Sequence, residues 1–186
     1  ATIMQTMNGE YDVKFPQARA LYMYMYAHPG KKLNFMGNEI GQFREWDEKR
    51  AQDWDILTYP IHDAFHRFMK NLNLLYLEHP ALYRNDYSTD GFRWIDCHQE
   101  ERCIYTFERI SEKERLLAVF NFSDQTQEDY EITLDNAKKL TLLLASDAPE
   151  YGGTKTYKDA DKEITLKKHC AAFSLSPHSA VYYKIS

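Results

Sequence analysis

The spacing of apolar residues changes at residues 85–91, and this change restricts the folds open to the chain. Before it, apolar side chains such as Phe65, Phe68 and Leu72 recur at three- and four-residue steps, the period of an amphipathic helix. After the change, short runs typical of β-strands follow one another at 92–95, 103–110, 116–121, 130–134, 139–145, 163–166, 170–175 and 180–185. Short strand-like runs without long helices between them favour an antiparallel β-sandwich or barrel. We therefore predict an α+β fold in which the helices come first.

Two helices are predicted in the first half of the chain. The first spans Pro16–His28 and begins with proline in its first turn. Its Tyr and Met residues surround most of the helix, so we expect it to be buried between neighbours. The second spans Ile61–Glu78 and has one clearly apolar face. The cluster of Asn, Asp, Ser, Thr and Gly at Asn85–Gly91 predicts a connector, so we divide the chain into residues 1–84 and 85–186.

The stretch between the two helices carries the best candidate for a functional site. Leu33, Phe35 and Met36 predict a brief buried strand that ends at Gly37, where a polar loop begins. In a barrel of alternating strands and helices, sites are built at this end of the strands. The candidate substrate-binding residues combine charged, hydrogen-bonding and stacking groups, and they are Glu39, Arg44, Glu45 and Trp46.

The same loop has a plainer interpretation. A loop rich in Glu, Arg and Asp is usually a solvated surface with weak ion pairs. Trp46 and Trp54 could be ordinary packing residues. One apolar strand also cannot form a parallel sheet by itself, so the barrel interpretation requires that its partner strands lie elsewhere.

Composition excludes several classes of function. The net charge of −5 and the pI of about 5.8 argue against a nucleic-acid partner, because no basic stripe is present to meet phosphates. No apolar run reaches the length of a membrane span and no signal-peptide pattern opens the chain, so we expect a cytoplasmic protein without membrane contact.

Metal and cofactor sites are not predicted. Cys97, Cys103 and Cys170 lack CxxC spacing, and we interpret them as buried thiols. His62 and His66 lie one helical turn apart, but no third ligand has matching spacing, and we interpret them as residues of the helix surface. We therefore expect no metal ion and no cofactor.

Sequence motifs around the polar loop carry a resemblance to a known family. The chain contains FMGNEIGQFREWDEKRAQDWDIL, preceded by YMYAHPGKKL, which resembles the last barrel strand and following loop of bacterial 1,4-alpha-glucan (glycogen) branching enzymes of the alpha-amylase clan. The resemblance continues through YPIHDAFHRFMKNLNLLYLEHPAL and then through GFRWID, LLAVFNFS, SDAPEYGG and LSPHSAVYYKI, so it covers nearly the whole chain. It implies that residues 1–84 form the seventh helix, eighth strand and eighth helix of a (β/α)8 catalytic barrel, and that residues 85–186 form a C-terminal β-sandwich.

The resemblance also implies an activity for the longer protein. Members of this family are retaining enzymes that cut an alpha-1,4 glucan and transfer the chain to a 6-hydroxyl, using a nucleophilic Asp, an acid/base Glu and a stabilising Asp. In the family all three residues lie on barrel strands that would precede Ala1. We therefore assign no catalytic residue to this chain and expect a C-terminal fragment that is inactive alone. The implied partners are an alpha-glucan, such as glycogen or amylose, and the missing N-terminal barrel.

Two other functions stay open. An independent carbohydrate-binding module would need an exposed aromatic platform on the sandwich, for which Trp94 and Tyr151 are the candidates, although a single tryptophan on a strand is usually a core residue. Trp94 accordingly joins the candidate substrate-binding residues. A purely structural domain would instead cap the barrel and never touch glucan. Under the fragment interpretation, residues 92–186 should fold alone, whereas residues 1–84 should depend on them.

Overall fold

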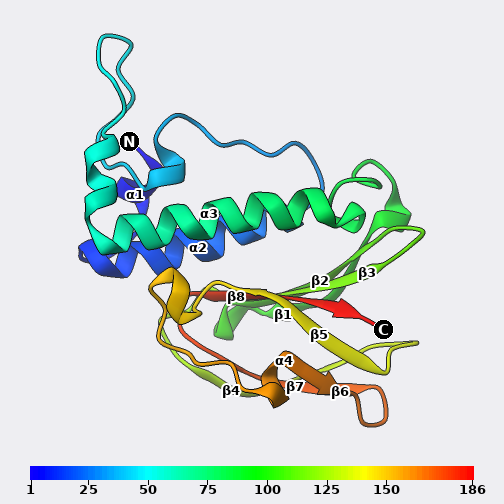
Figure 1. Cartoon of the computed structure of the whole chain (residues 1–186). Helices are drawn as coiled ribbons and strands as arrows, with labels where there is room; N and C mark the ends of the chain where they lie inside the picture. Colours follow the sequence, from blue (N-terminus) through cyan, green and yellow to red (C-terminus); the bar gives the residue numbers. More distant parts are fainter.

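The computed structural model describes all residues, 1–186, and places a layer of helices on one face of a β-sandwich (Figure 1). The helices are α1 (Ile3–Thr6), α2 (Tyr11–Ala27), α3 (Pro60–Glu78) and α4 (Asp159–Lys162). The strands are β1 (Phe92–Gln99), β2 (Ile104–Ile110), β3 (Arg115–Asn121), β4 (Gln127–Thr133), β5 (Lys139–Ala145), β6 (Glu163–Thr165), β7 (Cys170–Leu175) and β8 (Ser179–Ile185).

All eight strands predicted after residue 91 are present, and all of them pair antiparallel. Six form one sheet in the order β1-β2-β3-β8-β5-β6, while β4 and β7 form a second sheet of two strands. Neighbouring residues of β8 point to opposite faces of the larger sheet. The Tyr182 hydroxyl donates a hydrogen bond to the carbonyl of Met23 in α2, whereas the Tyr183 ring packs 5.7 Å from that of Phe173 in β7. One face of the sheet therefore meets the helices, and the other forms the core of the sandwich.

The two long helices differ in how well the sequence predicted them. The bounds of α3 agree with the prediction to within one residue at its start. The start of α2 was predicted wrongly, because the helix begins at Tyr11 and Pro16 lies inside it. Pro16 lies in the second turn of α2 and has no backbone N–H, so the helix lacks one intrahelical hydrogen bond there. As predicted, α2 is buried between neighbours, since it packs on β3, on β8 and on α3, where the Tyr22 and Phe65 rings lie 6.2 Å apart.

The N-terminal residues include a helix that the sequence analysis missed. Helix α1 begins after Thr2, whose hydroxyl accepts a hydrogen bond from the backbone of Gln5, while the Gln5 side chain accepts one from the backbone of Thr2. This reciprocal pair is a capping box. The spacing of Thr2 and Gln5 was the signal that could have revealed the helix.

The strand predicted at residues 33–36 does not form. Residues 31–35 have no regular secondary structure, and the Leu33 side chain is 73% exposed, with Phe35 and Met36 also exposed. A strand requires a hydrogen-bonded neighbour, and every strand in the structure lies beyond residue 91. The prediction of a buried strand was therefore wrong for this chain.

One apolar core joins the helices to the sheet. Its buried side chains range from Met4 to Ile185 along the sequence, so residues before and after the connector 85–91 belong to the same core. The connector consists of turns and a short 3-10 helix, Thr89–Gly91. The division of the chain into residues 1–84 and 85–186 stays a prediction, because both segments contribute to the same core.

A buried arginine crosses this junction. The Arg109 side chain, which is fully buried on β2, donates hydrogen bonds to the carbonyls of Ala27, Leu82 and Gly91 and forms an ion pair with Asp86. These partners belong to the end of α2, to the segment after α3 and to the connector. One guanidinium therefore links the last residue of α2, the segment after α3, the connector and the sheet.

The prediction of buried cysteines was wrong. Cys97 and Cys103 are half-buried near the end of the β1–β2 hairpin, and Cys170 is exposed. Residues along β7 alternate between exposed and buried, starting with exposed Cys170. Cysteine is usually buried, but here the register of the strand decides which way the side chain points.

Candidate functional site

The candidate loop starts from a tight turn between residues 37 and 42. Gly37 and Gly41 both have left-handed backbone angles, with φ of 85° and 68°, and they flank the 3-10 helix Asn38–Ile40. A Cβ atom at Gly37 would lie 2.9 Å from both the Cδ atom of Gln42 and the Oε1 atom of Gln52. Glycine is therefore required at position 37 both by its backbone angles and by the close approach of these side chains.

Two histidines attach this turn to α3. The Nδ1 atom of His62 lies 2.8 Å from the carbonyl oxygen of Ile40, and that of His66 lies 3.2 Å from the carbonyl oxygen of Glu39. His62 is only 3% exposed, so its prediction as a residue of the helix surface was wrong, and His66 is half-buried. The polar pattern of α3 did not reveal that the turn covers this part of the helix.

The buried imidazole of His62 should make stability depend on pH. Burial lowers the pKa of His62 below its usual value of 6.5, although the hydrogen bond to Ile40 opposes this effect. The unfolded chain therefore binds a proton more readily than the folded chain, and this contribution to stability is lost as pH falls through the folded pKa. We expect urea to unfold the chain at a lower concentration at about pH 5.5 than at about pH 7.5. The His62→Gln variant should show a smaller difference, and an equal difference in both proteins would contradict the assignment.

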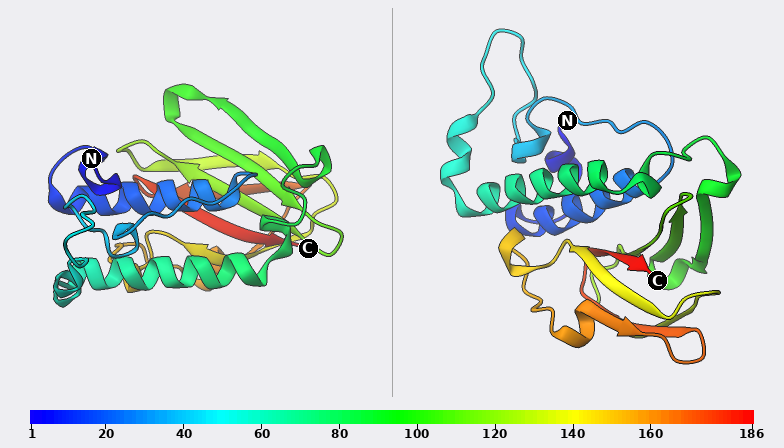
Figure 2. Two further views of the ribbon diagram at one scale, coloured as in Figure 1. Left: turned by 90° about the horizontal axis from the view of Figure 1, so that it is seen from above. Right: turned by 45° about the vertical axis from the view of Figure 1, so that its right-hand side comes forward.

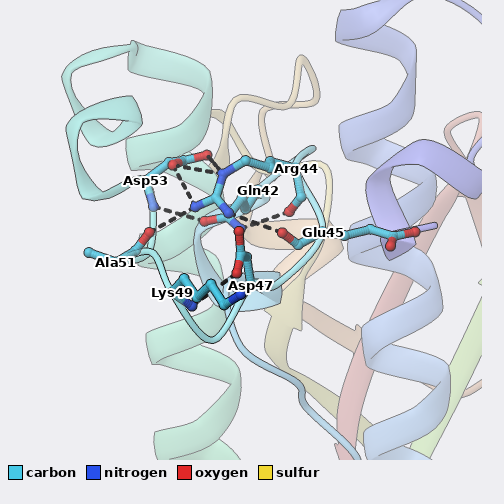
Figure 3. A network of polar contacts seen from close by, with 7 residues as sticks. All are labelled: Gln42, Arg44, Glu45, Asp47, Lys49, Ala51 and Asp53. Atoms are coloured by element: carbon cyan, nitrogen blue, oxygen red, sulfur yellow. Dashed lines mark hydrogen bonds and ion pairs between the residues drawn. The ribbon is translucent and has the colours of Figure 1, made fainter.

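The loop that follows, residues 45–51, has a neck formed by Gln42, Arg44 and Asp53, and polar contacts join these three residues (Figure 3). The Nε atom of Arg44 donates to both carboxylate oxygens of Asp53 at 3.1 Å, and its Nη2 atom donates to Oδ1 at 2.8 Å. Gln42 accepts a hydrogen bond from the Asp53 backbone and donates one to the Arg44 carbonyl. The hydrogen bond with Arg44 lowers the pKa of Asp53, so the pair is charged at neutral pH.

An apolar groove lies beside the loop. Its volume is about 700 Å³, and its apolar lining includes Leu21 and Met25 from α2 together with Leu33, Phe35 and Trp46. The Trp46 ring is 43% exposed and stands edge-on to the Phe35 ring with 5.8 Å between centroids. An apolar groove with an exposed stacking ring in its lining is a candidate ligand site.

Polar atoms at the groove are few. The Tyr22 hydroxyl is buried without a hydrogen-bond partner, and burial, aided by nearby Tyr26 and Glu39, raises the pKa of Tyr22 well above its usual value. The Glu45 carboxylate forms an ion pair with the Ala1 ammonium group.

The structure brings together some of the predicted site residues. Trp46 and Glu45 line the groove, while Glu39 lies in the turn that leads to it. Arg44 lies in the loop neck, where its guanidinium is paired with Asp53. Sequence reasoning missed the roles of Tyr22, Phe35 and Asp53, because it offered no signal for which residues meet in space.

Trp94 occupies a different surface. It is 41% exposed on β1, and its ring stands edge-on to those of Phe92 and Phe107, at 5.2 and 5.4 Å. In the left view of Figure 2, the β1–β2 hairpin extends past α2. The Trp94 side chain is therefore a half-exposed aromatic ring held by two neighbours.

Two other aromatic residues do not fit the interpretations that the sequence left open. Trp54 is 53% exposed at the start of a 3-10 helix, so it is not a packing residue. Tyr151 is only 4% exposed, with its hydroxyl accepting a hydrogen bond from Asn71 and its ring packed 5.5 Å from that of Phe68. Tyr151 cannot form an exposed platform, because α3 covers it.

The structure contains neither a cluster of metal-ligating side chains nor a helix that could span a membrane. No group of three or more His, Cys, Asp or Glu side chains is arranged to hold a metal ion. None of the helices combines the length and the apolar character needed to cross a membrane.

Comparison with known proteins identifies the β-rich half. Residues 94–186, half of the chain, match the family described as alpha amylase, C-terminal all-beta domain. The chain belongs to this alpha-amylase family. A solved structure of a trehalulose synthase mutant has a TM-score of 0.58 over 92% of this chain and 38% of the other, with 18% sequence identity. This level of structural similarity shows that the chain shares its fold with part of that protein.

Sequence relatives within the alpha-amylase family are more similar. A 1,4-alpha-glucan branching enzyme from Aquifex aeolicus is 40% identical and covers 98% of this chain, and that from Oceanobacillus iheyensis is 38% identical and covers 82%. The resemblance that the motifs carry is thereby confirmed. The chain spans 30% and 24% of the length of these two relatives.

Proposed function

We propose that this chain is the C-terminal part of a 1,4-alpha-glucan branching enzyme, which cuts an alpha-1,4 glucan and transfers the cut chain to a 6-hydroxyl. The observation that carries the proposal is the 40% identity over 98% of the chain to a relative of that name. In this proposal, residues 1–84 are the seventh helix, eighth strand and eighth helix of the catalytic barrel. Residues 85–186 are then the C-terminal β-domain.

The exposed residues 33–36 support the barrel assignment. Leu33 and Phe35 are apolar yet exposed, and they line the groove together with Leu21 and Met25 of α2. A neighbouring strand from the rest of the barrel would pair with this segment and cover its apolar side chains. Such pairing would also place the loop after Gly37 at the end of the barrel where sites are built.

The carboxylates of this chain do not supply the chemistry. Asp53 is held by the Arg44 guanidinium and is therefore not placed as an acid or nucleophile facing a second carboxylate across a sugar. We therefore expect the purified chain to show no branching or hydrolysis of amylose, whereas the longer protein should branch it. The measurement is the formation of alpha-1,6 linkages, and turnover by the chain alone would overturn the proposal.

The glucan-binding surface is assigned to the groove. We propose that Trp46 stacks on a glucose ring or forms a wall of the substrate cleft, with Glu39 and Glu45 near it to bind sugar hydroxyls. The exposed position of Trp46 at the groove supports this assignment. The proposal gives Arg44 a different role, because its guanidinium is already engaged in the loop neck.

Replacing Trp46 with alanine in the longer enzyme should lower activity about tenfold, because a stacking contact with the substrate is lost. The Trp54→Ala variant is the matched control, since Trp54 is also an exposed tryptophan of this region but does not line the groove. It should change stability by only about 0.5 kcal/mol and leave activity unchanged. Glucan kinetics and thermal unfolding of both variants provide the test, and a silent Trp46→Ala variant would exclude the assignment.

A second candidate function rests on Trp94. The Trp94 ring is half-exposed and packs edge-on against Phe92 and Phe107, so it could stack against a sugar ring independently of the barrel. Retardation of the chain in a glucan-containing gel, abolished by Trp94→Ala, would favour this carbohydrate-binding role. A domain that only caps the barrel would migrate unretarded.

A further inference from the structure

We infer that Gln42, Arg44 and Asp53 form a clamp that holds residues 45–51 in one conformation and thereby positions Trp46 for glucan, without touching glucan themselves. These three are positioning residues, and their role rests on the proposed function of Trp46. The clamp itself can be examined without any glucan.

The guanidinium of Arg44 joins both ends of the loop. Besides its bonds to Asp53, its Nη1 atom donates to the carbonyl of Glu45 at 3.2 Å and its Nη2 atom to the carbonyl of Ala51 at 2.8 Å. Each of the three guanidinium nitrogens therefore donates within the loop. A planar fork paired with a carboxylate fixes geometry as well as charge.

Gln42 connects the clamp to the rest of the molecule. Its buried side chain accepts from the Asp53 backbone at 2.8 Å and donates to the Arg44 carbonyl at 2.7 Å, so it bridges the two sides of the neck. Its backbone N–H donates to the carbonyl of Gly37 at 2.9 Å. Because His62 attaches the same turn to α3, the clamp is fixed to a rigid helix.

The tip of the loop has little structure of its own. Within residues 45–51, the backbone N–H of Lys49 donates a hydrogen bond to the Asp47 side chain, and that of Arg50 donates one to the Asp47 carbonyl. In Figure 1 and in the right view of Figure 2 the loop projects away from the helices. Its order must therefore come from the neck, because free residues would otherwise gain conformational entropy.

Loss of the clamp would act on binding through Trp46. An open loop would place the Trp46 ring beside Phe35 for only a fraction of the time, and apparent affinity falls in proportion to the competent fraction. The clamp should therefore affect the KM for glucan more than kcat. A direct glucan contact by Arg44 would instead act whether or not Trp46 is present.

The first test measures loop opening in the 186-residue chain by limited trypsin digestion. Cleavage after the exposed Lys49 and Arg50 should become about tenfold faster in Asp53→Asn and Arg44→Gln, with little change in thermal unfolding. The control is Asp55→Asn, which alters an exposed acid two residues away that accepts a hydrogen bond from Thr58 through its backbone carbonyl and not through its side chain. Equal cleavage of Asp53→Asn and Asp55→Asn would overturn the clamp.

The second test uses the longer enzyme and a double-mutant comparison. Asp53→Asn should raise the KM for amylose about fivefold and change kcat less than about twofold, but it should add nothing in a Trp46→Ala background. Additive effects would show that the pair contacts glucan itself and would overturn the positioning role. If the longer protein branched no glucan, the proposed function would fail, and the digestion test would still decide whether the clamp exists.

Discussion

Replacing Arg109 with leucine should lower the free energy of unfolding by about 4 kcal/mol. The change removes a fully buried guanidinium and leaves the Asp86 carboxylate and the carbonyls of Ala27, Leu82 and Gly91 without their donor. Buried groups that lose their partner bear the full cost of desolvation. Urea unfolding followed by far-ultraviolet circular dichroism would measure the loss.

A neighbouring arginine provides the control for Arg109. Arg93 on β1 also pairs with a buried carboxylate, that of Glu108, but its side chain is half-exposed and Glu108 keeps a second partner in Arg115. Arg93→Leu should therefore cost only about 1 kcal/mol. A loss for Arg109→Leu no larger than that for Arg93→Leu would show that the buried network adds little to stability.

A shorter chain containing only residues 92–186 should lose cooperative unfolding. Removing α2 and α3 would expose the face of the sheet that carries Phe107, Phe120 and Tyr182, all of which are buried in the intact chain. Such a sheet face, left in water, favours loose packing or self-association. This expectation reverses the one drawn from the sequence, where the β-rich segment was predicted to fold alone.

The truncation can be tested by the sharpness of urea unfolding and by binding of a dye that reports exposed apolar surface. A matched control deletes residues 45–51 only, because this loop contributes no buried side chain to the core. The control should unfold as sharply as the intact chain. A sharp transition without dye binding in the 92–186 chain would show that the sandwich is an independent unit.

Local patterns in the sequence determined the elements that depend on short-range physics. The eight strands follow from runs of strand-forming residues between turns, and α3 follows from apolar side chains at helical spacing. The motifs around Trp46 also led to the family that residues 94–186 match. In each case the signal lies within a few residues, because dihedral preferences and side-chain direction repeat along the element itself.

Contacts between distant residues decided the rest. Residues 33–36 have the composition of a buried strand, yet a strand forms only where a neighbour accepts its hydrogen bonds, and none lies beside this segment. Tyr151 is buried because it meets Phe68 on α3, whereas Trp54 is exposed because nothing covers it. The charges of Arg44 and Asp53 can be read from the sequence, but their pairing depends on how the turn at Gly37 folds back on α3. Burial and pairing are properties of two surfaces that meet, so only the tertiary structure could determine them.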